Sequence, residues 1–169
     1  RSFARLDEAE LKEADIRDGL EDTLGILQHE LKRGITVRRD YGEVPPFAHC
    51  PGRLNQVFLN ILVNAIQAIG KQGEITVTTR RKGNRAFIEI TDTGCGIPAE
   101  NLERIFDPGF TTKGVGVGTG LGLPICYQIV RDHDGEIRVA SEAGKGTTFT
   151  IVLPMDLGDR NARERFLSQ

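Results

Sequence analysis

The sequence lacks several features that would assign it to special protein classes. It has no basic excess, because 22 Lys and Arg stand against 24 Asp and Glu, and this balance argues against a nucleic-acid surface. Amides interrupt its longest apolar stretch, Val57 to Ile69, whereas a membrane span needs about 20 mostly apolar residues. We find no signal peptide. The three cysteines have no CxxC spacing, which argues against a zinc site or a disulfide framework (Cys50, Cys95, Cys126). We therefore expect a soluble, cytoplasmic domain.

Hydrophobic periodicity predicts the fold class, α/β. Apolar residues at helical spacing alternate with short β-rich runs, and Lys82-Gly83-Asn84 between two of these runs is a hairpin signal. This order of elements predicts an α+β two-layer sandwich: a mixed, mostly antiparallel sheet of about five strands, with about three helices on one face. The predicted helices are 16–33, 52–69 and 120–132, and the predicted strands are 35–41, 74–81, 85–92, 136–141 and 147–153.

The two ends of the chain differ from this core. Residues 1–15 are charged and mixed, and we interpret them as a linker or the end of a preceding helix. Residues 155–169 form a polar tail, so the folded domain would be 16–154. Because the sequence begins at Arg1 and not at Met, we expect a piece of a longer protein or a processed product.

An amide stripe marks the predicted helix 52–69. Asn60, Asn64 and Gln67 fall within roughly 60° of one another, opposite the apolar face, and Arg53 extends the stripe. A solvated polar face is the simplest interpretation, since every amphipathic helix needs one. The stripe carries amides, however, where surface helices usually carry Lys and Glu. An amide oxygen is a hard, neutral ligand that suits Mg²⁺, so the stripe is a candidate metal or phosphate site.

A second candidate is Asp92-Thr-Gly94-Cys-Gly96-Ile-Pro98, which follows the predicted strand 85–92. A carboxylate at a strand end, followed by two glycines, can meet a ligand at close backbone approach. Asp92 could accept from an exocyclic amine, which adenine and cytosine offer among the bases. A plain turn, in which Asp92 caps its own backbone, explains the same residues. This segment alone leaves both interpretations open.

A third candidate is the glycine-rich run from Lys113 to Leu123, which leads into the predicted helix 120–132. Free N–H groups beside the positive end of a helix form a natural phosphate site. The run lacks the GK[ST] ending of a P-loop, and no strand precedes it as in a Rossmann turn. A flexible linker is the alternative. Because the run enters an apolar helix, we predict a mobile lid that orders on a ligand.

Taken in order, these elements resemble the boxes of the histidine-kinase branch of the gyrase, chaperone, histidine-kinase and mismatch-repair ATPase superfamily. Any one box is a weak match, whereas four in order are specific. The resemblance covers residues 16–154. Asn60–Asn64 is similar to the N box, Asp92-x-Gly94-x-Gly96 to the G1 box, Phe106-Asp-Pro-Gly-Phe110 to the F box, Gly118-x-Gly120-x-Gly122 to the G2 box, and Gly146-Thr147 to the start of the closing strand.

The resemblance implies that these residues bind ATP and Mg²⁺. Asn64 corresponds to the asparagine that coordinates Mg²⁺, and Asn60 and Gln67 flank the phosphates, although many members carry a basic residue in place of Gln67. Asp92 corresponds to the aspartate that accepts from the adenine amino group, with Thr147 sharing a water beside it. Other matching positions line the adenine pocket (Gly94, Gly96, Ile97), border the phosphates and lid (Lys113, Gly118, Thr119, Gly120, Leu121, Gly122, Leu123), or pack the lid on the domain (Phe106, Phe110).

The implied reaction is transfer of the γ-phosphoryl group of ATP to a histidine. His29 superficially resembles an acceptor, but Gly34 replaces the proline of the acceptor box, and neither His49 nor His133 has supporting context. We therefore expect the acceptor on an upstream dimerisation domain that this chain lacks, with 1–15 as the end of its helix. The implied partners are that domain and the receiver domain of a response regulator. The parent would be a bacterial homodimer that can be membrane-anchored, and this chain alone a monomer without autophosphorylation.

Three alternatives use the same fold. A stand-alone ATPase of the gyrase or chaperone branch carries a glutamate base one helical turn before the Mg²⁺ asparagine, and Asn60 at that position cannot take a proton from water. A non-catalytic binding module would not need every box intact. An anti-sigma-type protein serine kinase differs in its protein substrate and not in these residues.

Overall fold

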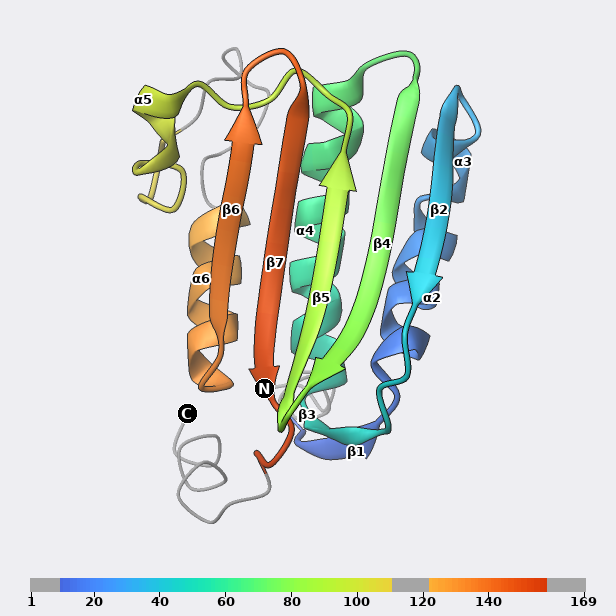
Figure 1. Cartoon of the computed structure of the whole chain (residues 1–169), viewed down its shortest axis with the longest axis vertical. Helices are drawn as coiled ribbons and strands as arrows, with labels where there is room; N and C mark the ends of the chain where they lie inside the picture. Colours follow the sequence, from blue (N-terminus) through green and yellow to red (C-terminus); the bar gives the residue numbers. More distant parts are fainter. Residues whose placement is uncertain (1–9, 111–121, 158–169) are drawn as a thin grey trace, which may run out of the picture.

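A computed structural model describes residues 10–110 and 122–157. Its five-stranded sheet has the order β2-β4-β5-β7-β6, in which β2 and β4 are parallel and the other neighbours antiparallel. The helices α2, α4 and α6 lie on one face of this sheet (Figure 1). The predicted mixed, mostly antiparallel sheet with helices on one face is therefore confirmed. The strands are β2 Ile35–Tyr41, β4 Gly73–Lys82, β5 Arg85–Asp92, β6 Glu136–Glu142 and β7 Gly146–Pro154, and the helices are α2 Ile16–Ile26, α3 Gln28–Leu31, α4 Pro51–Ile69, α5 Ala99–Leu102 and α6 Gly122–Asp132.

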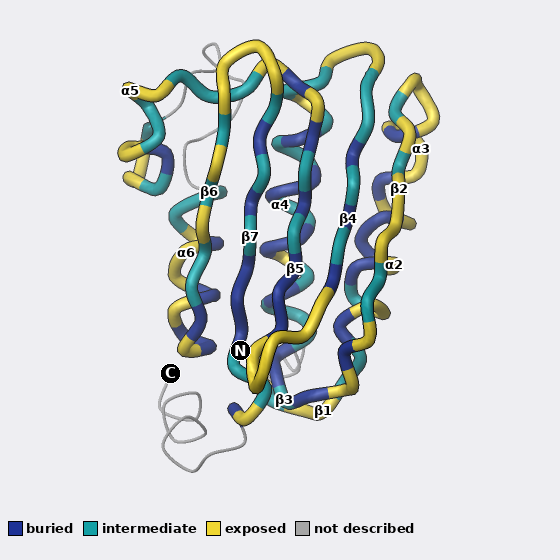
Figure 2. Tube along the Cα trace, in the orientation of Figure 1, coloured by how far each residue is buried: buried dark blue, intermediate teal, exposed yellow. Residues whose placement is uncertain are grey.

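The core lies between the sheet and the three longer helices. Alternate residues of the central strands point to the helices, and Ile75, Ile88 and Ile151 are fully buried there. The central helix α4 contributes the largest apolar stripe, which includes Phe58 and Leu62. The buried stretches of β5 and β7 lie side by side in the sheet, and α4 covers them from one face (Figure 2). Burial of this layer fixes which face of each strand carries apolar residues, and so fixes the register.

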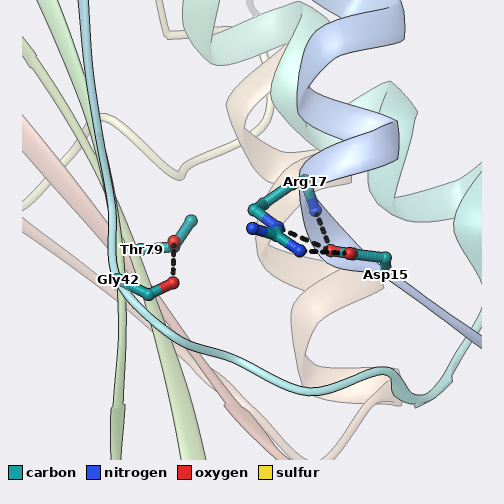
Figure 3. A network of polar contacts seen from close by, with 4 residues as sticks. All are labelled: Asp15, Arg17, Gly42 and Thr79. Atoms are coloured by element: carbon teal, nitrogen blue, oxygen red, sulfur yellow. Dashed lines mark hydrogen bonds and ion pairs between the residues drawn. The ribbon is translucent and has the colours of Figure 1, made fainter.

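Polar contacts lie at the end of the molecule where α2 begins and β2 ends (Figure 3). Asp15 caps α2 by accepting from the Arg17 backbone N–H at 2.9 Å, and its carboxylate pairs with the Arg17 guanidinium at 2.8 Å (Figure 3). The Arg17 hydrogen bond lowers the pKa of the Asp15 carboxyl. Beyond the end of β2, Gly42 N–H donates to the Thr79 carbonyl at 2.7 Å, and Thr79 Oγ1 donates to the Gly42 carbonyl. The chain therefore stays on the sheet edge after β2.

The structure contains three short elements where we expected none: β1, β3 and α5. Strand β1, Lys12–Ala14, pairs with β3, Phe47–His49, within the segment that we interpreted as a linker or helix end. Three residues are stable as a strand only through this distant partner, so they carry no local signal. Helix α5 is likewise a single turn, between the predicted strand 85–92 and the predicted helix 120–132. No helix in either described range is long and apolar enough to cross a membrane.

Candidate functional site

The C-terminal part of the amide stripe, which begins at Asn60, borders helix α6. We call this boundary between the two helices the α4–α6 seam. Asn60 is half-buried, and a Cβ placed on Gly122 at the start of α6 would lie 3.5 Å from Asn60 Oδ1. The Asn60 amide also hydrogen-bonds the buried thiol of Cys126, although burial dominates and raises the pKa of that thiol to about 12. Asn64 is half-buried one turn further along α4, whereas Gln67 is exposed. The stripe is therefore not simply a solvated face.

Arg53, at the N-terminal end of the stripe, has a structural partner. Arg53 forms an ion pair with Asp132 near the end of α6, with 3.0 Å between Nη2 and Oδ2. Gln128 donates to the other carboxylate oxygen at 2.8 Å. Because the Asp132 carboxylate is only 7% exposed, loss of either partner would leave a buried polar group unpaired. Arg53 thus joins two helices, and the ligand-facing part of the stripe begins at Asn60.

Asp92 is a buried carboxylate at the end of β5, with 6% of its surface exposed. Its Oδ1 accepts from Gly94 N–H at 2.8 Å, and the carboxylate also accepts from the backbone N–H of Thr147. Burial raises the pKa of Asp92, and these two hydrogen bonds partly oppose the rise. Thr147 is the direct cross-strand neighbour of Asp92 on β7. A carboxylate offers about four acceptor positions, so two backbone donors leave capacity for a ligand.

The turn after Asp92 is wedged between α4 and the β6–β7 hairpin. A Cβ on Gly94 would lie 2.6 Å from the Ala68 carbonyl carbon of α4, and Cys95 N–H donates to the Ala68 carbonyl at 3.0 Å. On the other side, a Cβ on Gly96, whose φ is +76°, would overlap the Glu142 carbonyl. Glycine is required at both positions by this close approach. The wedge brings the end of the amide stripe next to the Asp92 segment.

Ser141, near the end of β6, is a site residue that sequence reasoning missed. Its Oγ accepts from Ile97 N–H at 2.7 Å and lies 2.8 Å from Thr147 Oγ1. It therefore ties the turn after β5 to the hairpin that carries Thr147. A serine in a predicted strand carries no signal of such a role, since it has ordinary composition for a strand end.

The structure brings five predicted residues together in what we name the Asp92 corner: Asp92, Gly94, Gly96, Ile97 and Thr147. It places Asn60 and Gly122 together at the α4–α6 seam, with Asn64 one turn further along α4, and Leu123 packs partly buried against the core. Phe106 and Phe110 also pack against the core, as predicted. The other predicted lid residues lie outside the described residues (Lys113, Gly118, Thr119, Gly120, Leu121).

None of the three histidines lies near the Asp92 corner or near the end of the α4–α6 seam where Asn60 meets Gly122. His29 is exposed on α3, within the domain. His49 Nδ1 contacts the Phe47 carbonyl at 2.9 Å. His133 is fully buried: its Nδ1 contacts the Ile129 carbonyl at 2.9 Å, and its Nε2 accepts from Cys50 N–H at 3.1 Å. Burial lowers the pKa of His133 to about 4, so the ring is neutral at pH 7.

Two other features do not mark the site. A cavity of about 430 Å³ lies beside β1 and β3, at the opposite end of the sheet from Asp92, and its lining includes Phe47 and Met155 but none of the predicted site residues. In the described part of the chain, no group of three or more His, Cys, Asp or Glu is placed to hold a metal ion. We therefore locate the site by the chemistry of the strand and helix ends.

Sequence comparisons match this architecture. The model of a family described as "Histidine kinase-, DNA gyrase B-, and HSP90-like ATPase" matches residues 50–157. Sensor histidine kinase ZraS of Escherichia coli (strain K12) is 50% identical over 114 residues, which are 68% of this chain and 24% of that protein. Sensor kinase CckA of Brucella abortus (strain 2308) is 37% identical over 177 positions, covering 95% of this chain and 19% of that protein. The chain spans about a quarter of the length of the curated relatives it matches.

Solved structures share the fold. The catalytic domain of histidine kinase ThkA matches with a TM-score of 0.78 at 30% identity, covering 86% of this chain and 98% of that one. Full-length ShkA in complex with AMPPNP matches with a TM-score of 0.78 at 26% identity, covering 86% of this chain and 31% of that one. ThkA in complex with the response regulator protein TrrA matches with a TM-score of 0.76 at 27% identity, covering 89% and 43%.

Proposed function

The chain belongs to the family of histidine kinase-, DNA gyrase B- and HSP90-like ATPases, and from this premise we propose that it is the ATP-binding catalytic domain of a two-component sensor histidine kinase. The observation that carries the proposal is the Asp92 corner. There a carboxylate remains buried although burial opposes its ionised form, and its own turn does not use its full acceptor capacity. Ionisable groups whose pKa is shifted by burial cluster at functional sites.

Adenine would bind at the Asp92 corner. The Asp92 carboxylate would accept from the exocyclic amino group, and Thr147 would contact a water beside it. Gly94 and Gly96 bring backbone close to the ligand, and Ile97, which is half-buried, would pack on the base. The match to ShkA in complex with AMPPNP, an adenine nucleotide, supports this assignment.

The phosphates would lie toward the seam between α4 and α6. Asn64 would hold Mg²⁺ through its amide oxygen, with Asn60 and Gln67 beside the phosphates. Such a neutral ligand fits a cation that keeps several waters and phosphate oxygens. When bound, Mg²⁺ neutralises charge that develops on the transferred phosphoryl group. Gly122 and Leu123 would lie at the phosphate end with the lid residues Lys113, Gly118, Thr119, Gly120 and Leu121, which we assign on the sequence alone.

We infer that the phosphoryl group goes to a histidine on an upstream dimerisation and acceptor domain of the parent. The imidazole is already a good nucleophile, so the domain's task is to position ATP and stabilise charge. The match to ThkA in complex with TrrA supports the receiver domain of a response regulator as a further partner. The parent would be a cytoplasmic or membrane-anchored homodimer, and this chain a monomer when isolated.

A stand-alone ATPase is the second candidate, because the family includes such enzymes. Hydrolysis needs a base to take a proton from water, and the position one turn before Asn64 is held by the amide of Asn60. The Asn60 amide hydrogen-bonds the Cys126 thiol and lies beside Gly122, where an added Cβ would meet it at 3.5 Å. This observation favours transfer over hydrolysis. A protein serine kinase would use the same corner and differ only in its acceptor.

Two measurements test the proposal. Purified chain with Mg·ATP should show little turnover in a coupled hydrolysis assay, and turnover at the rate of a dedicated ATPase would refute the kinase assignment. Mixed with ATP and a separately made acceptor domain, the chain should transfer phosphate that is acid-labile and base-stable, as for phosphohistidine. Acid-stable phosphate on the acceptor would indicate a serine kinase instead. An acceptor domain with its histidine replaced by alanine is the control.

A further inference from the structure

Ser141 connects three parts of the Asp92 corner through one hydroxyl group. Its Oγ accepts from Ile97 N–H at 2.7 Å, donates to the Gly146 carbonyl at 2.9 Å, and lies 2.8 Å from Thr147 Oγ1. Ile97 belongs to the turn after β5, whereas Gly146 and Thr147 begin β7. The side chain is half-buried, so these partners replace water that the hydroxyl would otherwise bind.

The donors and acceptors of this group can be counted. A serine hydroxyl has one proton to donate and two lone pairs that accept. The Gly146 carbonyl can only accept, so the Ser141 proton is used there. Ile97 N–H can only donate, so it takes one lone pair. The contact between the two hydroxyls must therefore be a donation from Thr147 to Ser141, which saturates Ser141.

This arrangement determines what Thr147 can offer a ligand. Its single hydroxyl proton points to Ser141, so Thr147 Oγ1 presents only lone pairs elsewhere. Thr147 stands directly across the ladder from Asp92, whose carboxylate also acts as an acceptor, as its hydrogen bond from Gly94 N–H shows. Both side chains are nearly buried, at 5% and 6% exposed. The Asp92 corner therefore shows a ligand two side-chain acceptors and no side-chain donor.

We propose that Ser141 is a positioning residue that sets the base selectivity of the Asp92 corner. By holding the Thr147 proton, it makes the corner favour a base with an amino group over one with a keto group at the same position. This inference rests on the proposed function, since it concerns the base of the nucleotide. Without Ser141, the Thr147 hydroxyl is free to rotate and to donate toward a keto oxygen, directly or through the water beside the base.

The test compares ADP with inosine 5′-diphosphate, which carries a 6-keto group in place of the 6-amino group. Calorimetry gives the Kd of each with the purified chain. The wild type should bind ADP the more tightly. In Ser141→Ala the ratio of the two Kd values should fall about tenfold, the scale of one hydrogen bond gained by the keto base. Ser141→Thr keeps the hydroxyl and should keep the wild-type ratio.

A matched control and a double-mutant cycle isolate the effect. Thr148→Ala removes a similar hydroxyl pair, 2.9 Å from Thr91 Oγ1, on the sheet face away from the helices, and should leave the ratio unchanged. In a Thr147→Val background, Ser141→Ala should no longer change the ratio, because no hydroxyl remains to rotate. If Ser141→Ala fails to fold, Ser141→Cys, whose thiol is the weaker acceptor, should give an intermediate ratio.

The outcomes separate the inference from the proposed function. A wild type that binds neither nucleotide refutes the proposed function itself. If the wild type prefers ADP but Ser141→Ala weakens both nucleotides equally, the hydroxyl has only a structural role and the inference is wrong. An unchanged ratio in Ser141→Ala, or a changed ratio in the Thr147→Val background, would also overturn it.

Discussion

Asp92→Asn should separate ligand binding from folding at a single atom. Asparagine keeps one side-chain oxygen, which can still accept from Gly94 N–H, so the turn after β5 is retained. The other oxygen becomes an NH₂ group, which donates where the adenine amino group needs an acceptor. Two donors then face each other in a buried site.

The expected effects on ADP affinity and on stability differ in size. An unsatisfied buried polar group costs about 1–3 kcal/mol, so ADP affinity should fall roughly 5- to 150-fold. Stability should change less than affinity. Burial raises the pKa of Asp92 above its unfolded value, so ionisation destabilises the fold as pH rises through that range. The neutral amide removes this penalty but keeps only one oxygen for the two backbone donors, Gly94 N–H and Thr147 N–H, so the two effects on the free energy of unfolding oppose each other.

Calorimetry with ADP and urea unfolding at pH 7 measure the two effects. Asp40→Asn is the matched control, because Asp40 is an exposed strand carboxylate on β2, and it should alter neither quantity. Unchanged ADP affinity in Asp92→Asn would remove Asp92 from the base-binding role. A loss of affinity with an equal loss of unfolding free energy would show that Asp92 merely caps its turn.

Two further predictions concern stability. Gly96→Ala should lower the unfolding free energy more than Gly144→Ala. Both glycines have positive φ (+76° and +86°), which costs about 1 kcal/mol for alanine, but only at Gly96 would the Cβ also overlap another residue, the Glu142 carbonyl. Equal losses of unfolding free energy in urea titrations would contradict the packing argument. Acidification from pH 6.5 to 4 should lower the unfolding free energy by about 3 kcal/mol through His133, because the unfolded chain takes up the proton first while burial holds the folded pKa to about 4. His133→Gln should lose less stability over this range, and an equally steep loss would be evidence against it.

The predictable part of the fold is the part with a local signal. Strands β2 and β5 have the predicted bounds, 35–41 and 85–92, because their composition and flanking turns define them. The pairing of strands has no such signal. Ile35 pairs in parallel with Gly73, far along the chain, and strand β1 exists only through β3. These contacts depend on how the layers pack, which a single sequence does not state.

The site divides in the same way. The residue types at Asp92 and in the amide stripe indicated ligand chemistry, but the contact between the turn after Asp92 and the end of α4, through Gly94 and Ala68, depends on the wedged turn. On a helical wheel, Arg53 falls on the same stripe of α4 as Asn60. Only the structure separates their roles: Arg53 pairs with the buried carboxylate of Asp132, whereas Asn60 lies beside Gly122, the first residue of α6.

The Asp92 corner is rigid because its glycines are enclosed. Gly94 meets Ala68, Gly96 meets the Glu142 carbonyl, and a Cβ on Gly146 would overlap the Asp92 carbonyl. Backbone contacts of this kind set the shape of the corner, whereas the Asp92 and Ser141 side chains set its pattern of donors and acceptors. Substitution of the glycines should therefore damage folding and binding together. The backbone, and not the Asp92 and Ser141 side chains, sets the shape of the corner. Substitution of these two side chains can therefore alter selectivity while the domain stays folded.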